Sequence, residues 1–146
     1  MADPKVAVFF YGSYMNRAVL KEAGLAPERF EVAKLNGFEI EIRPLANLAL
    51  SDAGYTYGLL TLATHVELER LYAHAREVLG GTYLPRAVVV EVQGGGLQPA
   101  LCYIAPSLEP RLADNEYIDR VVGPARQHGF PQWYLEHLES FRPAAR

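Results

Sequence analysis

The run Val6–Tyr11 restricts the fold more than any other stretch, because it is apolar or aromatic at every position and stops at Gly12-Ser13. A short run without alternation is typical of a strand that is buried on both faces. Asn16 can cap a brief helix after the loop, and Gly24 is placed to end that helix in a left-handed conformation. The chain is therefore predicted to begin with a strand, a loop and a short helix.

Three further segments have the patterns of strands. Residues 38–43 alternate apolar and charged side chains, as in a strand with one wet face, and Pro44 ends this segment or places it at an edge. Residues 45–50 and 55–62 predict two more strands, separated by the turn signal Ser51-Asp52-Ala53-Gly54. The sheet then has four candidate strands.

Thr64 and Glu67 have the spacing of a capping box, in which each side chain can satisfy a backbone amide of the other residue at a helix start. Apolar side chains follow at helical spacing, at Leu68, Leu71, Tyr72 and Ala75. We expect this stripe to pack in the core rather than to hold a cofactor.

The second half of the chain predicts a hairpin and two helices. Residues 86–92 and 97–105 are strand-like and are joined by three consecutive glycines, Gly94 to Gly96. A helical stripe covers residues 117–125, and Pro131 opens a last helix. The chain is thus expected to contain six or so strands and three or four helices.

The composition fits a single folded domain over residues 1–146, because half of the residues are hydrophobic and 21% are charged. The net charge is −3 and the basic residues are scattered, so we expect neither nucleic acid nor an anionic membrane surface as a partner. The apolar stretch Val6–Phe10 is too short for a secretory segment or a membrane span, which predicts a cytoplasmic protein. The oligomeric state stays open.

The sequence predicts no cofactor and no metal. The four histidines include no pair at the i,i+3 or i,i+4 spacing that brings two imidazoles to one helix face. The glycine clusters lack the Lys-Ser/Thr of a phosphate loop and the spacing of a dinucleotide fingerprint. Cys102 is the one cysteine, so an internal disulfide is excluded; a buried strand residue is its commoner interpretation, and a nucleophile is the other.

Ser13 follows the first strand, at a junction where a nucleophile can be presented. Its neighbours do not form a nucleophile elbow, and no base can be identified for it. A second interpretation makes Ser13 a hydrogen-bonding group in a loop where Gly12 allows close approach to a ligand and successive amides hold a carboxylate. A plain tight turn is the third interpretation.

Phe10-Tyr11-Gly12-Ser13, after a short strand near the N-terminus, resembles the Tyr-Gly-Ser substrate loop of the γ-glutamylcyclotransferase-like family. Tyr57-Gly58-Leu59-Leu60 is similar to the family's aromatic-Gly-Val-Leu strand, and further segments follow in the family's order: Ala100–Tyr103, Tyr117, and Gly129–Pro131 with Tyr134. The resemblance covers nearly the whole chain. It implies an α+β fold, with a small, mostly antiparallel, closed or nearly closed β-barrel-like sheet surrounded by helices.

The resemblance also implies a reaction. In this family the α-amino group of a γ-glutamyl amine or dipeptide attacks the γ-carbonyl of the same molecule, which releases 5-oxoproline and a free amine or amino acid. One carboxylate moves the protons, while the loop holds the substrate's α-carboxylate and positions the nucleophile. In this chain that loop is Tyr11, Gly12, Ser13, Tyr14 and Met15. Tyr14-Met15 replaces the Asn-Leu that is common in the family.

Glu77 is the acid/base that the resemblance implies, because it lies just past the predicted capped helix and six residues before Tyr83. The negative end of the helix dipole and the apolar neighbours Val78 and Leu79 would raise its pKa. The family's glutamate is commonly followed by Gly, whereas here Gly80 comes three positions later. If the glycines set the alignment, Leu79 takes the catalytic place and the protein binds without turnover. A solvated helix-end residue is the remaining interpretation of Glu77.

Three downstream tyrosines, Tyr83, Tyr103 and Tyr117, match family tyrosines near the site, where a phenol can orient the glutamate or contact the substrate. Each is also a plausible core aromatic. The leading hypothesis is therefore a γ-glutamylcyclotransferase without cofactor, and a catalytically silent ligand-binding domain of the same fold is its rival. The choice among γ-glutamyl substrates stays open.

Overall fold

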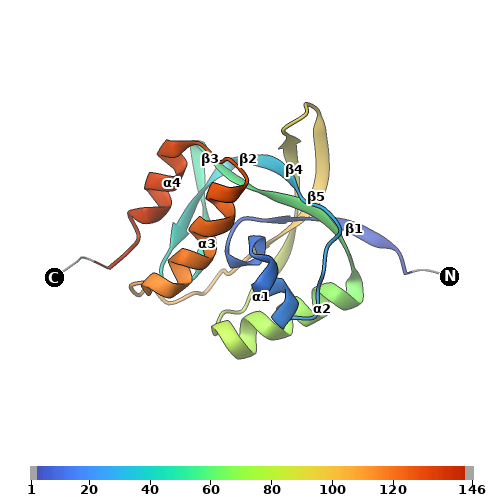
Figure 1. Ribbon diagram of the computed structural model, residues 1–146, viewed down its shortest axis with the longest axis horizontal. Coiled ribbons are helices and arrows are strands. Elements are labelled where there is room, and N and C mark those ends of the chain that lie inside the picture. The colour runs from blue at the N-terminus through green and yellow to red at the C-terminus, as the bar shows by residue number, and fades with distance from the viewer. Residues whose placement is uncertain (1–2, 144–146) are drawn as a thin grey trace.

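A computed structural model describes residues 3–143, and five strands form a closed barrel in it (Figure 1). The strands are β1 (Lys5–Phe10), β2 (Glu31–Ile42), β3 (Ala46–Thr64), β4 (Leu84–Val92) and β5 (Leu97–Ile104). Their order around the barrel is β1-β3-β2-β4-β5. All neighbours are antiparallel except β1 and β5, which pair in parallel at Val8–Leu101 and Phe9–Cys102. The predicted class, a mostly antiparallel barrel-like sheet with surrounding helices, is confirmed.

The predicted division of residues 45–62 into two strands is wrong, because β3 runs unbroken from Ala46 to Thr64. Leu50 pairs with Phe38 and Tyr55 pairs with Asn36, so residues 51–54 lie opposite Gly37 alone. Gly37 has a φ of 89°, and this left-handed backbone lets β2 stay paired with β3 on both sides of the unequal numbers of residues. The turn signal therefore marks an outward bulge, and the strand continues past it.

The predicted helices are confirmed. They are α1 (Arg17–Glu22), α2 (His65–His74), α3 (Asn115–Gln127) and α4 (Gln132–Glu139). The Asn16 side chain accepts hydrogen bonds from the amides of Ala18 and Val19, and both bonds of the Thr64–Glu67 capping box are present. Beyond α2 the helix continues as the π-helical turn η2 (Ala75–Leu79), which ends at Gly80 in a left-handed conformation.

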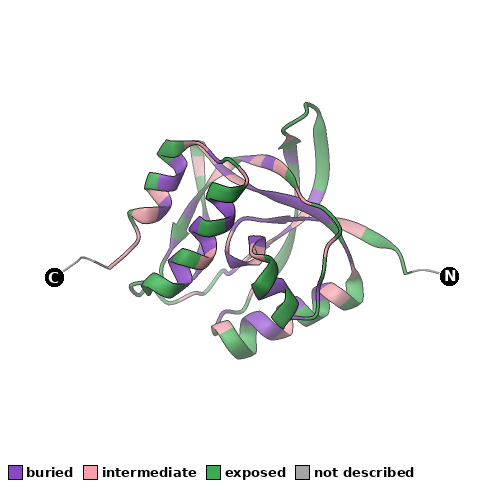
Figure 2. Ribbon diagram, in the orientation of Figure 1, coloured by how far each residue is buried: buried purple, intermediate pink, exposed green. Residues whose placement is uncertain are grey.

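The helices cover the barrel in two groups (Figure 1). Helices α3 and α4 pack together on one side, and α1 lies near α2 on another. Their buried faces turn toward the barrel, as Figure 2 shows in purple. The largest fully buried side chains include Tyr134 of α4, Ile118 of α3, Leu20 of α1 and Phe9 of β1, and all four belong to one hydrophobic cluster. One core thus joins the strands to both helix groups.

Within residues 3–143, no helix combines the length and the apolar character that a membrane crossing requires.

Candidate functional site

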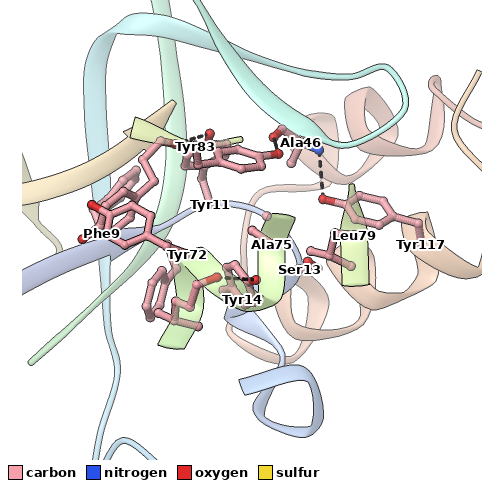
Figure 3. A pocket seen from close by; sticks show the side chains of 14 residues that line it. Phe9, Tyr11, Ser13, Tyr14, Ala46, Tyr72, Ala75, Leu79, Tyr83 and Tyr117 are labelled. Carbon is pink, nitrogen blue, oxygen red and sulfur yellow. Dashed lines mark hydrogen bonds between the residues drawn. The ribbon is translucent and has the colours of Figure 1, made fainter. Parts of the chain in front are cut away.

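A cavity of about 50 Å³ lies where β1 runs into the loop Tyr11–Met15 (Figure 3). The second half of this loop is the short 3-10 helix η1 (Ser13–Met15). The walls come from β1, this loop, β3, α2, η2, β5 and α3, and they consist of Phe9, Phe10, Tyr11, Gly12, Ser13, Tyr14, Ala46, Leu71, Tyr72, Ala75, Leu79, Tyr83, Tyr103 and Tyr117. A volume of this size holds about three or four water-sized groups. The cavity therefore fits one end of a small ligand.

Gly12 fixes how the loop meets the barrel. A Cβ on Gly12 would lie 2.6 Å from the Cβ of Ala46, the first residue of β3. The sequence suggested that this glycine allows the backbone to approach a ligand. In the structure its missing side chain lets the loop lie against Ala46, which any larger residue at position 12 would push away.

Ala46 is also held by two of the predicted tyrosines (Figure 3). Its amide donates a hydrogen bond to the Tyr117 hydroxyl at 2.9 Å, and its carbonyl accepts one from the Tyr83 hydroxyl. The Tyr11 hydroxyl donates to the Tyr103 carbonyl at 2.6 Å. These tyrosines stabilise the walls of the cavity, because each hydrogen bond joins two segments that are distant in sequence.

The phenols around the cavity stay protonated at neutral pH. Burial raises the pKa of Tyr11, Tyr14, Tyr83 and Tyr103. Burial also raises the pKa of Tyr117, although the Ala46 amide and Ser13 favour its ionised form. Tyr11 and Tyr83 already donate their hydroxyl hydrogens to backbone carbonyls, so their oxygens can only accept a hydrogen bond from a ligand. Tyr117 accepts from the Ala46 amide and keeps its own hydroxyl hydrogen for donation, and no phenol is a base by itself.

The helical wall of the cavity is apolar. Leu71, Ala75 and Leu79 are spaced four residues apart on α2 and η2, which brings them to one face, and that face lines the cavity. The sequence predicted Leu71, Tyr72 and Ala75 as core. Leu71 and Ala75 are buried and Tyr72 is half-buried, but the surface that all three help to form is the wall of the site. An apolar stripe looks the same in the sequence whether it packs in the core or lines a cavity.

Glu77 lies outside the cavity. It is exposed, and it is not among the residues that line the cavity. Its position in η2 is two residues from both Ala75 and Leu79, which places it on the opposite side of the helical turn from the face that they share. Leu79, the residue that the alternative register placed at the catalytic position, is in the wall. Among the lining residues in the described part of the chain, none carries a carboxylate, an imidazole or an amine.

Of the nine residues that the sequence proposed for the site, seven surround the cavity: Tyr11, Gly12, Ser13, Tyr14, Tyr83, Tyr103 and Tyr117. Met15, like Glu77, does not line it, because its side chain is 1% exposed and packs in the hydrophobic core. Ser13 is buried beside the Tyr117 phenol. No imidazole or carboxylate shares the cavity with Ser13, so the wall offers no base to activate it as a nucleophile.

Sequence reasoning missed one polar arrangement beside the cavity. The Tyr14 hydroxyl lies 2.9 Å from Nδ1 of His74, and Nε2 of His74 lies 3.2 Å from a carboxylate oxygen of Glu22. His74 is 8% exposed. The three residues belong to η1, α2 and α1, so only the folded chain brings them together.

Two other candidate features have structural explanations. Cys102 is buried in β5, and burial raises the pKa of its thiol to about 12, which keeps it unreactive. Over the described residues 3–143, no group of three or more His, Cys, Asp or Glu side chains converges as a metal site would require.

A shallow groove adjoins the cavity. It has a volume of about 480 Å³ and shares Leu79 and Tyr117 with the cavity. Arg111 and Arg120 lie along it, and Arg120 forms an ion pair with Glu116 at 2.7 Å.

The fold has known counterparts. A solved structure described as a gamma-glutamyl cyclotransferase matches with a TM-score of 0.83 at 20% identity, over 98% of this chain and 91% of that chain. The chain has a γ-glutamylcyclotransferase-like fold. An uncharacterised human protein shares this γ-glutamylcyclotransferase-like fold with a TM-score of 0.83 at 20% identity, over 97% of this chain and 90% of that one.

A more distant counterpart is the yeast gamma-glutamyl cyclotransferase specific to glutathione, with a TM-score of 0.65 at 13% identity, over 95% of this chain and 96% of that chain. The sequence itself matches no protein-family model and no curated protein. At these identities a shared γ-glutamylcyclotransferase-like fold does not transfer an activity. The function has to be inferred from the cavity.

Proposed function

We propose that this chain binds a γ-glutamyl amide in the cavity beside Tyr11–Met15 and converts it to 5-oxoproline and a free amine or amino acid. The observation that carries the proposal is that seven residues, chosen from the sequence for their likeness to a γ-glutamyl site, surround one cavity. The cavity accommodates one end of a small molecule. The Tyr117 hydroxyl keeps a hydrogen that it can donate to a carboxylate, and the Tyr11 and Tyr83 oxygens can accept from an amide or ammonium group. The shared fold supports the same reaction class.

The proposal assigns binding to Tyr11, Gly12, Ser13, Tyr14, Tyr83, Tyr103 and Tyr117, with the α-carboxylate of the γ-glutamyl group in the cavity. The leaving amine or amino acid would lie in the groove beyond Leu79. Closely packed walls would hold the α-amino group near the γ-carbonyl carbon, and this positioning supplies much of the rate for an intramolecular attack.

Release of 5-oxoproline from a panel of γ-glutamyl amino acids and γ-glutamyl amines tests this function. We expect the unmodified protein to release 5-oxoproline from at least one panel member. Calorimetric titration with the same compounds measures binding separately from turnover. A protein that cleaves no panel member would overturn the proposed conversion, and a protein that also binds none would overturn the binding role.

Glu77 is the acid/base that the sequence favours, and its exposed position requires its side chain to swing in from the surface. The Glu77→Gln variant tests this role, with Glu69→Gln on the exposed face of α2 as the matched control. Loss of turnover in Glu77→Gln alone would support Glu77. Equal turnover in both variants would assign the proton transfer to another group.

The second candidate is a silent binding domain, and the apolar helical wall favours it. If the protein binds γ-glutamyl compounds without cleaving them, a carboxylate placed in that wall should create turnover. Leu79→Glu makes this change at a residue that lines the cavity. Release of 5-oxoproline by Leu79→Glu, but not by the unmodified protein, would support the silent domain.

A further inference from the structure

The polar chain beside the cavity has the order carboxylate, imidazole, hydroxyl. Glu22 is at the surface, with half of its side chain exposed, whereas the His74 side chain is almost fully buried. The Tyr14 ring reaches the cavity wall beside Tyr72 and Ala75 (Figure 3). The same order of groups links a reacting hydroxyl to a base and an orienting acid in many enzymes.

The contacts of His74 favour one tautomer when its imidazole is neutral. An ionised Glu22 accepts hydrogen bonds only, so Nε2 of His74 carries the hydrogen that faces it. In the neutral imidazole Nδ1 is then an acceptor, and the Tyr14 hydroxyl donates to it at 2.9 Å. The Leu71 carbonyl is a longer alternative acceptor for the same hydroxyl, at 3.3 Å. A hydrogen-bonded path thus runs from the cavity wall to a surface carboxylate.

The other hydroxyls at the cavity have no such path. Tyr11 and Tyr83 donate to backbone carbonyls, and Tyr117 accepts from a backbone amide. Backbone groups cannot take up or return a proton in a reaction. Tyr103 and Tyr72 pair with each other, phenol to phenol. Tyr14 is therefore the lining tyrosine whose hydroxyl contacts a titratable imidazole.

We propose that Tyr14, His74 and Glu22 form the proton relay of the cavity, a role that rests on the proposed cyclotransfer. The α-ammonium of the substrate passes a proton to the Tyr14 oxygen as the Tyr14 hydroxyl proton moves to Nδ1 of His74. Glu22 stabilises the resulting imidazolium. Tyr14 touches the substrate in this scheme, and His74 and Glu22 act through it.

The remaining steps balance without a co-reactant. The freed amine attacks the γ-carbonyl carbon, and the bond from that carbon to the amide nitrogen breaks. The leaving nitrogen takes the proton that His74 returns through Tyr14. The attacking nitrogen gives its surplus proton to the released amine, which leaves as an ammonium, and 5-oxoproline keeps one N–H.

The raised pKa of Tyr14 agrees with this order of events. Because burial keeps the phenolate unpopulated at neutral pH, Tyr14 accepts a proton only in step with passing on its own. Glu77 has no part in the relay, so Glu77→Gln should retain turnover.

Kinetics of Tyr14→Phe, His74→Gln and Glu22→Gln, with Glu69→Gln as the control, test the relay. We expect the kcat for 5-oxoproline release to fall at least about 100-fold in Tyr14→Phe and His74→Gln, because general acid–base groups contribute about 10²–10⁴ in rate. KM should change by less than about threefold, since the walls of the cavity remain. The kcat should fall about tenfold in Glu22→Gln and should not change in Glu69→Gln. A purely structural role would instead raise KM and lower the unfolding temperature.

The outcomes separate the two proposals. If the unmodified protein releases 5-oxoproline and Tyr14→Phe keeps its kcat, the relay is overturned and the cyclotransfer stands. If the unmodified protein cleaves no panel member, both are overturned. Imidazole ¹⁵N chemical shifts of the unmodified protein add a test that needs no variant: the relay requires His74 in the Nε2–H form, and the opposite tautomer would contradict it.

Discussion

At the scale of single residues, Gly58 shows how tightly the barrel is packed behind the site. A Cβ on Gly58 would lie 2.4 Å from the Phe10 carbonyl oxygen and 2.5 Å from Cζ of Phe9. A backbone oxygen of β1 cannot move without disturbing the strand that carries the loop. We expect Gly58→Ala to lower the free energy of unfolding by about 2 kcal/mol or more, measured by urea denaturation.

Gly123→Ala is the control for this substitution. Gly123 is exposed within α3 and has nothing within 4 Å of the Cβ position. Alanine should therefore stabilise the protein by about 0.5–1 kcal/mol, because glycine is the poorer helix former. Equal effects of the two substitutions would show that the close contacts at Gly58 do not limit packing.

Single residues also mark where sequence reasoning stops. The aromatic positions of the site could be chosen from the sequence, because they follow one another in the order of a known family. The orientation of Glu77 could not, because it depends on the path of η2 beyond the last residue of α2. The contact of His74 with Tyr14 and Glu22 joins three elements, and no local pattern encodes it.

At the scale of elements, the capping box at Thr64 fixes the start of the helix that walls the cavity. The Thr64 hydroxyl accepts from the Glu67 amide at 3.1 Å, and Glu67 accepts from the Thr64 amide at 2.8 Å. Thr64→Ala should reduce the free energy of unfolding by about 1 kcal/mol. Thr82 is exposed and lies in no helix or strand, so Thr82→Ala should leave the free energy of unfolding unchanged. Chemical denaturation of both variants measures the difference, and identical midpoints would refute the role of the cap.

Elements with local signals were predictable, and elements that depend on partners were not. Caps, glycines and stripes located the four helices and the β4–β5 hairpin. The continuity of β3 depends on its pairing with β2 across the bulge opposite Gly37, a contact between strands. A turn signal of four residues favours a turn when it is considered alone, and the sheet overrides it.

At the scale of the whole molecule, Tyr117 connects α3 to the barrel and to the loop of the site. Its hydroxyl accepts a hydrogen bond from the buried amide of Ala46 and lies 3.6 Å from the Cβ position of Gly12. Tyr117→Phe leaves that amide without an acceptor, which should cost about 1–3 kcal/mol of stability.

Tyr134→Phe is the comparison, because Tyr134 is also buried, on α4, but makes a longer hydrogen bond of 3.3 Å to the Tyr57 carbonyl. The loss of this hydrogen bond should lower the free energy of unfolding by about 1 kcal/mol or less. Thermal unfolding of the two variants gives the comparison. A larger loss in Tyr134→Phe would show that the connection through Ala46 is not the stronger one.

The parallel pairing of β1 with β5 has a consequence during synthesis of the chain. Val8 and Phe9 leave the ribosome early, and their partners Leu101 and Cys102 follow only after most of the chain has been synthesised. Until then one edge of a mostly apolar strand stays open, and open edges of this kind invite pairing with other chains. A nascent chain that is released before β5 should therefore need protection from aggregation, because the first strand to be made is the last to be enclosed.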